Sequence, residues 1–462
     1  MPPAVLPLVD LLAHNNNPNI LDINDIDYHD DDTTYNNLNP EHKEGTATFF
    51  KTCFNGLNAL SGVGLLSVPY ALSSGGWLSL ILLFTIAAST CFTGMLIRRC
   101  MDLDPKIRTY PDIGGRAFGK IGRGVVSIVT YSELYLVATG FLILEGDSLH
   151  DLFSSVHFDF SWINISGRVG FVIIVALIIL PSVWLRDLSI LSYVSATGFL
   201  ACVVIIGSVL WTGAVDGYNE KGKTLNLSRI PTAFAMYTFC YSGHPVFPTL
   251  YTSMKDKSQF NKVTNLLGYL FFYVSNTDTD MHHFHLQVLL LCFALCTIGY
   301  TLMAILGYLM YGEHVNSQVT LNLPVKRFSS KVALYTTLVI PITKYALIMT
   351  PIVSAIENRL TYNKKLLNIL IRTLLLVTTV IVALVVPFFG DLTSLTGAFL
   401  NSIASIILPC ICYLKMSGTY KKWSYELIII LAILIMGVSS GMIGTYSSLS
   451  DLVRHLRGNI QK

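Results

Sequence analysis

The chain has 462 residues, of which 52% are hydrophobic and 13% charged, and its mean hydropathy is +0.57. A soluble domain carries about 25% charged residues, so this composition excludes an ordinary soluble protein and places most of the chain in lipid. The net charge of +3 is too small to indicate a nucleic-acid partner.

The first 46 residues form an acidic, asparagine-rich tail without helical periodicity, which we expect to be disordered and cytosolic. A bilayer span needs about 20 apolar residues. By that rule residues 47–450 form a transmembrane domain, and residues 451–462 a short lumenal tail. The eleven predicted spans lie near 47–70, 76–97, 124–145, 168–185, 190–213, 230–251, 288–311, 332–354, 368–388, 393–414 and 425–448.

Glycine and proline interrupt two of these spans. The first span contains Ser61-Gly62-Val63-Gly64 followed by Pro69, and the sixth contains Tyr241-Ser242-Gly243-His244 followed by Pro248. In hydrocarbon, unpaired backbone is tolerated only where it is buried in protein or lines a wet cavity. Close helix packing would also explain the glycines of the first span, but the proline and the second interruption favour broken helices. Such paired breaks indicate the binding site of an inverted-repeat transporter.

Basic residues predict the orientation. With the tail in the cytosol, twenty of the 31 Lys and Arg residues fall on the cytosolic side, Arg372 among them, and ten on the other. This excess predicts a cytosolic N-terminus and a C-terminus on the opposite side. Residues 98–123 are predicted to be a cytosolic loop with glycine turns. The cysteines fall mainly in or beside apolar spans, so we expect no structural disulfide.

Several stretches together match one family pattern. They are Gly62-x-Gly64 with Pro69, Glu133-Leu134-Tyr135, Leu144-Glu145-Gly146-Asp147, Ser242-Gly243-His244 with Phe247-Pro248, Gly307-Tyr308, Thr320-Leu321-Asn322-Leu323-Pro324 and Thr343-Lys344-Tyr345-Ala346-Leu347. Over residues 45–450 the chain resembles the amino acid/auxin permease family, and within it the plant vacuolar amino-acid transporter branch.

This resemblance implies an all-α integral membrane fold with eleven transmembrane helices. The first ten would form two inverted five-helix repeats of the leucine-transporter type, with helices 1 and 6 broken. The resemblance also implies proton-coupled secondary transport of neutral amino acids across the vacuolar membrane. The plasma membrane is the alternative location. We expect a monomer whose partners are neutral amino acids, protons and the lipid bilayer, driven by the proton gradient without a cofactor, and no nucleic-acid partner.

Residues 263–287 depart from the family pattern. Their apolar part is too short to span a bilayer, so the segment is predicted to be an atypical cytosolic insert. Its 25 codons are in frame, and it begins with Val263 and ends with Gln287, which is compatible with a retained intron. The alternative is a metal-binding tract at Met281-His282-His283-Phe284-His285, although no second ligand cluster accompanies it. We therefore expect no metal site.

Breaking a helix exposes N–H groups at the start of one half and carbonyl groups at the end of the other. We expect the N–H groups of Gly62, Val63 and Gly64 to receive a substrate carboxylate, because a helix N-terminus favours an anion. The carbonyls around Ser61, and those of the second break at Tyr241-Ser242-Gly243, would receive the ammonium. Side-chain selectivity then depends on packing, and the candidate residues are Ser132, Gly140, Phe239 and Phe247.

Three ionisable residues lie inside spans: Glu133, His244 and Lys344. Such residues are candidates for proton coupling. By the resemblance, Lys344 faces the first helix at the place where sodium-coupled relatives hold a cation; the alternative is a structural lysine bonded to carbonyls of the broken helix. His244 and Glu133 are either proton sites or structural groups. Three further acids, Glu145, Asp147 and Asp187, are predicted to be interfacial, at helix ends.

Two other classes of function fit the sequence less well. A non-transporting membrane sensor of amino acids would bind the same substrate without moving it, but the tail is too short to be a signalling domain. An enzyme is not expected, because the spans carry no paired carboxylates and no metal-ligand cluster.

Overall fold

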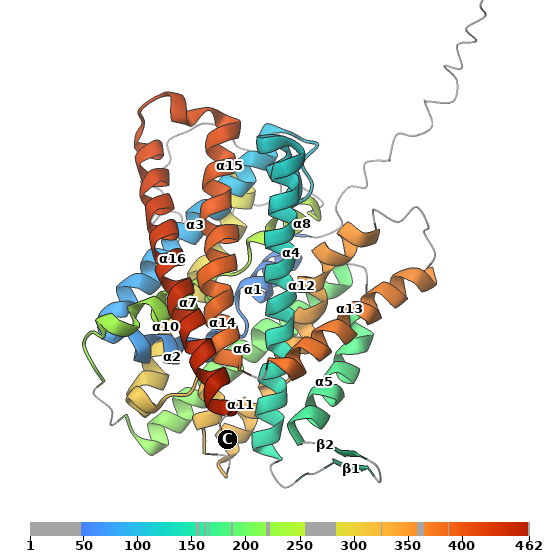
Figure 1. Ribbon diagram of the computed structural model, residues 1–462, viewed down its shortest axis with the longest axis vertical. Helices are drawn as coiled ribbons and strands as arrows, with labels where there is room; N and C mark the ends of the chain where they lie inside the picture. The colour runs from blue at the N-terminus through green and yellow to red at the C-terminus, as the bar shows by residue number, and fades with distance from the viewer. Residues whose placement is uncertain are drawn as a thin grey trace, which may run out of the picture. The chain divides into compact units, whose positions relative to one another are not determined.

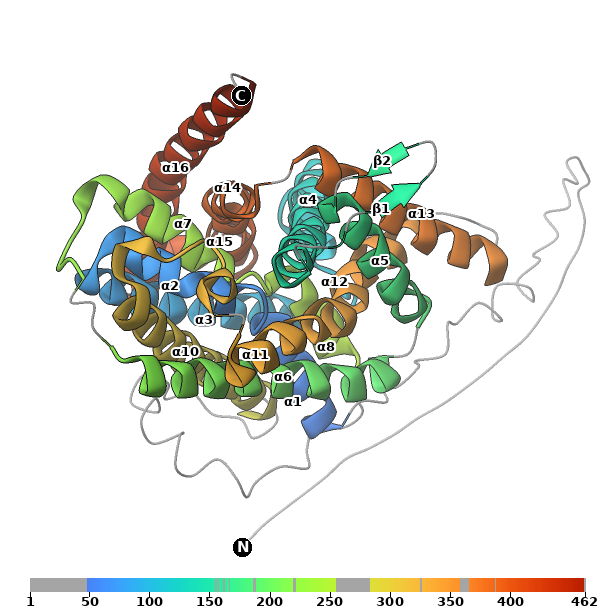
Figure 2. The same cartoon turned by 90° about the horizontal axis from the view of Figure 1, so that it is seen from below.

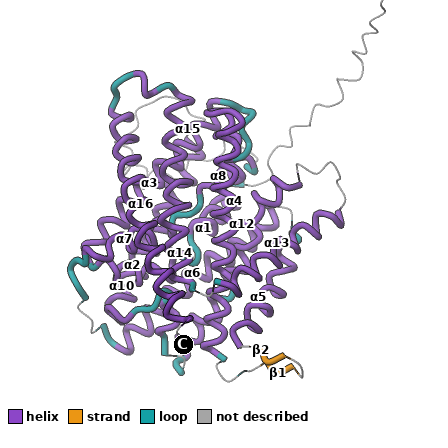
Figure 3. The backbone as a smooth tube through the Cα atoms, viewed as in Figure 1, coloured by secondary structure: helices purple, strands orange, loops and turns teal. Residues whose placement is uncertain are grey.

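The computed structural model describes residues 48–153, 156, 158–160, 163–165, 167–185, 188–218, 222–254, 283–324, 326–357, 365–386 and 388–460. Helix dominates this part of the chain, as Figure 3 shows. The α-helices are α1 (Phe49–Leu60), α2 (Gly64–Gly75), α3 (Leu80–Leu103), α4 (Tyr110–Leu152), α5 (Gly167–Val183), α6 (Leu188–Asp216), α7 (Ile230–Cys240), α8 (Phe247–Thr252), α10 (His283–Tyr311), α11 (Phe328–Thr337), α12 (Val339–Glu357), α13 (Lys365–Val385), α14 (Phe389–Leu395), α15 (Leu408–Ser417) and α16 (Tyr425–Ile460).

Shorter helical turns and one wide helix complete the set. The 3₁₀ turns are η2 (Trp77–Ser79), η3 (Leu227–Arg229), η4 (His244–Val246), η6 (Gly312–His314), η7 (Val319–Asn322) and η9 (Thr419–Lys421), and η8 (Thr396–Ile407) is a π-helix. Strands β1 (Phe158–Phe160) and β2 (Ile163–Ile165) form an antiparallel hairpin between α4 and α5, with Phe158 opposite Ile165 (Figure 1). The hairpin is a small addition to the predicted all-α fold.

A helix lies in each of the eleven predicted spans. Eight helical segments of the described chain are long and apolar enough to cross a membrane. The other three predicted spans correspond to α1 with α2, to the 17-residue α5, and to α7 with α8. Two of these three are interrupted and the third is short, so the number eleven stays a prediction. The predicted tail of residues 1–46 lies outside the described residues, as does most of the insert; α10 begins at His283.

The predicted loop at 98–123 is wrong. Helix α3 continues to Leu103, and α4 begins at Tyr110 behind a capping box, in which Thr109 and Asp112 bond to each other's backbone N–H groups. A kink at Phe118 and Gly119 then redirects the helix, and Gly119 has a φ of +67°, a conformation that suits glycine. The glycines therefore mark a bend in a helix rather than the turns of a loop.

Packing divides the helices by their neighbours. Helix α2 contacts α7 and α10, whereas α12 contacts α4 and α6, and α13 contacts α4 and α5. Figure 2 shows α6, α10 and α11 along one edge, and α6 contacts both of the others. Helix α16 packs against η8 and α7 and continues to Ile460, so most of residues 451–462 extend this helix. Helix α2 of the first broken span thus packs against α7 of the second and against the continuous helix α10.

Two acids differ from their predicted place at helix ends. Helix α4 ends at Leu152, and Glu145 lies within it with none of its surface exposed, so the interfacial placement of Glu145 is wrong. Asp147 is partly buried and forms an ion pair with Arg168 at the start of α5. Asp187 lies outside the described residues.

Candidate functional site: two broken helices and a buried lysine

The first span breaks between α1 and α2. Helix α1 ends at Leu60 and Ser61 takes an extended conformation with φ −77° and ψ +117°, after which α2 begins at Gly64. The residues of the break are buried. Among the described residues, the N–H groups of Gly62 and Val63 donate no backbone hydrogen bond. The break therefore presents two free donors at the N-terminus of α2, where the helix dipole favours a negative group.

Lys344 of α12 reaches this break. Its Nζ donates to the carbonyl oxygen of Ser61 at 3.3 Å and lies 5.8 Å from the ring centre of Phe141 on α4. Only 5% of Lys344 is exposed. A Cβ added at Gly62 would lie 2.0 Å from this Nζ, so the absence of a side chain at Gly62 makes room for the ammonium. The lysine and the first break form one site.

The sixth span breaks between α7 and α8. Helix α7 ends at Cys240, and the chain passes through Tyr241, Ser242 and Gly243 before the short turn η4. Ser242 N–H donates to the carbonyl of Phe239 at 3.2 Å, and Gly243 N–H donates to the carbonyl of Tyr241 at 2.9 Å. The carbonyl of Ser61 is thus engaged by Lys344 and that of Tyr241 by a backbone N–H. No such contact engages the carbonyl of Ser242 among the described residues.

The two breaks touch each other. A Cβ added at Gly64 would lie 2.8 Å from the Cα of Cys240, so the two backbones approach as closely as glycine allows. The thiol of Cys240 donates to the carbonyl of Gly64 at 3.5 Å. The buried hydroxyl of Tyr300, on α10, contacts the carbonyls of Leu60 at 2.5 Å and Cys240 at 2.9 Å. One phenol therefore caps the ends of both α1 and α7.

Sequence reasoning missed Tyr300. A tyrosine in the middle of an apolar span is a usable signal, because a buried phenol hydroxyl needs a hydrogen-bond partner. Its partners lie 240 and 60 residues away along the chain. The signal predicts a partner without saying which one.

The ring of His244 has its polar contacts on α3. Its Nε2 lies 3.0 Å from both Oγ1 of Thr93 and the carbonyl oxygen of Thr90, on α3. Thr93 Oγ1 in turn donates to the carbonyl of Ser405 on η8 at 2.6 Å. The ring lies 4.9 Å from that of Phe247, centre to centre. The histidine thus ties the second break to α3 and η8, and no hydrogen bond joins it to the lysine.

Glu133 is buried in α4 with no exposed surface, and neither carboxyl oxygen has a hydrogen-bond partner among the described residues. No hydrogen bond or ion pair joins it to Lys344 or His244. The structure therefore brings Lys344 to the first break and His244 to the second, and leaves Glu133 apart from both.

The candidates for selectivity are scattered. Phe239 packs against Gly397 of η8, and Gly140 lies within about 4 Å of Phe389 and Leu392, counted from an added Cβ. Phe247 lines a cavity of about 60 Å³ between α1, α3, α8 and α10, together with Gly56 and other mostly apolar residues. Ser132 is partly buried. Ser132, Gly140 and Phe239 do not line this cavity.

Comparison with known proteins identifies the family. The profile of the family described as "Transmembrane amino acid transporter protein" matches residues 45–278 and 270–450. The chain belongs to this family. Its two matching segments meet inside the insert of residues 263–287. As expected, the family is one of transporters rather than enzymes.

Curated relatives are similar along almost the whole transmembrane domain. Amino acid transporter AVT1I of Arabidopsis thaliana is 51% identical over 414 residues, covering 88% of this chain and 96% of its own length. Amino acid transporter AVT1J of the same plant is 49% identical over 429 residues, covering 92% and 95%. These relatives confirm the predicted branch of the family.

A solved structure agrees in fold alone. The crystal structure of MhsT in complex with L-phenylalanine matches 88% of this chain and all of its own, with a TM-score of 0.56 and 11% identity. The leucine-transporter type of fold, predicted from the resemblance, is confirmed by this match.

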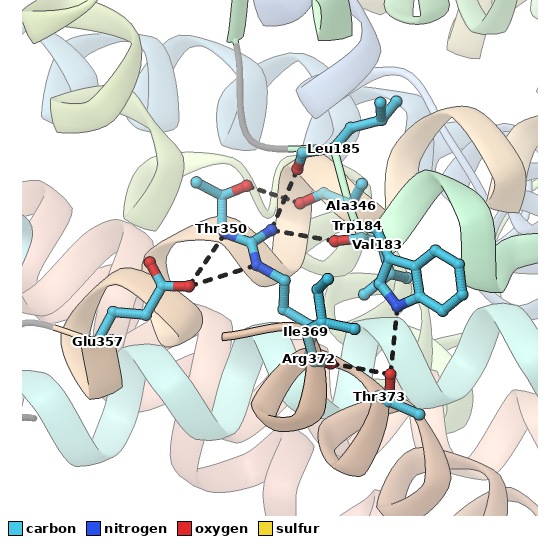
Figure 4. Close-up of polar contacts among 9 residues, drawn as sticks. All are labelled: Val183, Trp184, Leu185, Ala346, Thr350, Glu357, Ile369, Arg372 and Thr373. Atoms are coloured by element: carbon cyan, nitrogen blue, oxygen red, sulfur yellow. Dashed lines mark hydrogen bonds and ion pairs between the residues drawn. The ribbon is translucent and has the colours of Figure 1, made fainter. Parts of the chain in front are cut away.

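Arg372 is a second buried cation, near one end of α13. It was counted with the cytosolic loops, but it lies inside the helix and is 5% exposed. Its Nη1 donates to the carbonyls of Val183 at 3.0 Å and Leu185 at 3.1 Å, and its Nε lies 3.4 Å from Oε1 of Glu357 (Figure 4). One guanidinium thus joins α13 to the C-terminal ends of α5 and α12.

Proposed function

We propose that this protein is a proton-coupled secondary transporter of neutral amino acids in the vacuolar membrane. The observation that carries the proposal is the contact of two helix breaks with each other and with Lys344, whose Nζ lies 3.3 Å from the Ser61 carbonyl. Membership in a family of amino acid transporters supports the substrate class. The resemblance to the vacuolar branch supports the location, with the N-terminus in the cytosol and the opposite face toward the lumen.

The backbone of the breaks recognises the zwitterion common to amino acids. The free N–H groups of Gly62 and Val63 receive the carboxylate at the start of α2. The carbonyl of Ser242, at the second break, receives the ammonium, with Tyr241 and Gly243 shaping its approach. The charged side chain that reaches the first break, Lys344, is engaged by the Ser61 carbonyl, which favours substrates whose own side chains are neutral.

Lys344 couples the substrate to the proton. Protonated, its ammonium holds the Ser61 carbonyl and fixes the break; without its proton it gives up the charge that attracts this carbonyl. Loss of the proton then has the same effect on α1 as release of a metal cation from the same place. Glu133 and His244 are the second candidates for the proton.

The test is amino-acid flux into proteoliposomes under an imposed pH gradient. Uptake of a neutral amino acid is expected to require the gradient and to be lost in Lys344→Ala. A second comparison uses the protein lacking residues 263–287: uptake in that form alone means that the insert disables the transporter. Binding without flux in either form would contradict transport and leave the sensor. Gradient-driven uptake that persists in Lys344→Ala would contradict the coupling role of the lysine.

A further inference from the structure

A second buried carboxyl group lies between the candidate site and the lumenal side. Glu145 of α4 has no exposed surface, and neither carboxyl oxygen has a hydrogen-bond partner among the described residues. Burying a carboxylate without a partner is strongly unfavourable, so this environment accepts the group only in its neutral form. The buried state of Glu145 is therefore one in which it holds a proton.

One face of α4 connects this group to both neighbours. Residues 141, 145 and 148 follow a spacing of four and three, which places them along one side of a helix. Phe141 lies 5.8 Å from the Nζ of Lys344, and Ser148 Oγ is 3.5 Å from Oε1 of Gln318. Glu145 thus lies about one turn, or roughly 6 Å, beyond the aromatic ring that covers the lysine, on the way to Gln318.

Gln318 belongs to a connection that is buried although it joins two helix ends. Between α10 and α11, residues Gln318, Val319 and Thr320 are each no more than 1% exposed. Val319 packs beside Gly307 and Pro69, at α2. The hydroxyl of Thr320 is buried without a hydrogen-bond partner in the described part of the chain. We call residues 315–323 the lumenal segment; it packs against α2 and α4.

Among the described residues no group hydrogen-bonds or ion-pairs with Glu145; on α4 itself Asp147 pairs with Arg168, and His150 lies five residues further along. The titratable groups on elements that contact α4 include Arg168 (α5), Lys331 (α11), Lys344 (α12), Arg372 (α13), Asp391 (α14), Tyr413 (α15) and His244 (η4). On α3, Arg98 pairs with Asp102 and Arg99 with Glu426. None of these groups hydrogen-bonds or ion-pairs with the Glu145 carboxyl, and η7 and η8 carry no titratable side chain.

We propose that Glu145 is a proton-binding site that controls the lumenal segment: the segment packs against α4 only when Glu145 carries a proton. The ionised form requires water, which reaches it when residues 315–323 move away from α4. A proton from the lumen therefore holds the segment against α4, and loss of that proton releases it. This inference rests on the proposed proton coupling and names a group beyond Lys344.

The test measures opening rather than transport. A cysteine introduced by Thr320→Cys is labelled with a water-soluble maleimide at about pH 5 and about pH 8. Its labelling rate at each pH is divided by the labelling rate of Leu227→Cys at the same pH. Leu227 is 76% exposed, so this control corrects for the effect of pH on the thiol reaction. The corrected rate is expected to rise at least about tenfold at the higher pH, because the segment opens when Glu145 ionises.

Two further variants locate the group. Glu145→Gln, which cannot ionise, is expected to keep Thr320→Cys protected at both pH values, whereas Asp151→Asn, at an exposed acid of the same helix, is expected to retain the pH dependence. A pH dependence that survives Glu145→Gln overturns the proposal. The proposal can be overturned even if Glu145→Gln does not fold. In that case the single variant Thr320→Cys is sufficient: a corrected labelling rate that does not change with pH overturns the proposal. Because labelling needs no flux, pH-dependent labelling without amino-acid uptake would contradict the proposed function and support the proton site.

Discussion

The two buried cations of this protein, Lys344 and Arg372, differ in how completely they are partnered. Arg372 donates to the carbonyls of Val183 and Leu185 and contacts the carboxylate of Glu357. Within the described part of the chain, Lys344 contacts the carbonyl of Ser61 and the face of Phe141, and no carboxylate. A buried charged group whose hydrogen-bond donors are all satisfied holds its surroundings in one arrangement. A buried charge with a single carbonyl partner depends on its proton and on that carbonyl.

The elements around the two cations follow the same division. Arg372 joins α5, α12 and α13, and the last two belong to apolar segments long enough to cross a membrane. Lys344 faces the interrupted first span. The comparison indicates that the continuous helices form a fixed frame and that the broken ones, held by weaker contacts, are the part that changes during transport.

The largest expected effect is a difference in the free energy of unfolding between variants of Arg372 and of Lys344. Arg372→Met leaves the carboxylate of Glu357 and two helix-end carbonyls without their donor, so we expect the free energy of unfolding to fall by about 3 kcal/mol. Lys344→Met removes one hydrogen bond and leaves an apolar chain of similar length, for which we expect a loss of about 1 kcal/mol. Thermal unfolding of the purified proteins in detergent measures both. Equal losses would contradict the comparison.

A matched control tests the source of the Arg372 effect. Glu357→Gln keeps a hydrogen-bond acceptor for the guanidinium but removes the negative charge. We expect it to destabilise the protein less than Arg372→Met does, because the carbonyls of Val183 and Leu185 keep their donor. A larger loss in Glu357→Gln would mean that the ion pair, rather than the helix-end contacts, holds this region.

The next effect concerns the contact between the breaks. In Gly64→Ala the new Cβ meets the backbone of Cys240 at 2.8 Å, so one helix has to move, whereas in Gly62→Ala it meets the mobile end of Lys344. We expect Gly64→Ala to reduce both unfolding temperature and uptake. Gly62→Ala is expected to keep the fold and to reduce uptake at least about tenfold, because it displaces the ammonium. Proteoliposome uptake and thermal unfolding, measured together, check this; normal uptake in Gly62→Ala would contradict it.

The breaks were predictable because their signals are local. Gly62, Gly64 and Pro69 act on the backbone beside them, and the same holds for Gly243 and Pro248. The start of α4 also had a local signal, Thr109 with Asp112 three residues later, and the prediction of a loop there overlooked this capping box. An element that is set by a short local pattern can be found from the sequence.

The partners of buried polar groups were not predictable in this way. Tyr300, Arg372 and Glu145 all lie in apolar stretches, and the role of each depends on the helix that it faces. Tyr300 meets Leu60 across 240 residues, and Arg372 meets Val183 across 189. Hydropathy locates such residues in the membrane without giving the rotation of their helices. The position of Lys344 beside the first helix was expected from the resemblance, not from its own surroundings.

The smallest expected effect concerns His244, whose Nε2 is partnered on α3. If the histidine has a structural role, Thr93→Val removes one hydroxyl between it and Ser405, and we expect a loss of stability of about 1 kcal/mol with uptake still driven by the pH gradient. His244→Asn is expected to behave alike, since an amide can donate to the carbonyl of Thr90. Loss of gradient dependence in His244→Asn, but not in Thr93→Val, would instead assign the proton to the histidine. The broken sixth span would then carry a titrating group of its own, His244. Each broken span would have one titrating side chain, in contrast to the fixed Arg372 of the continuous helices.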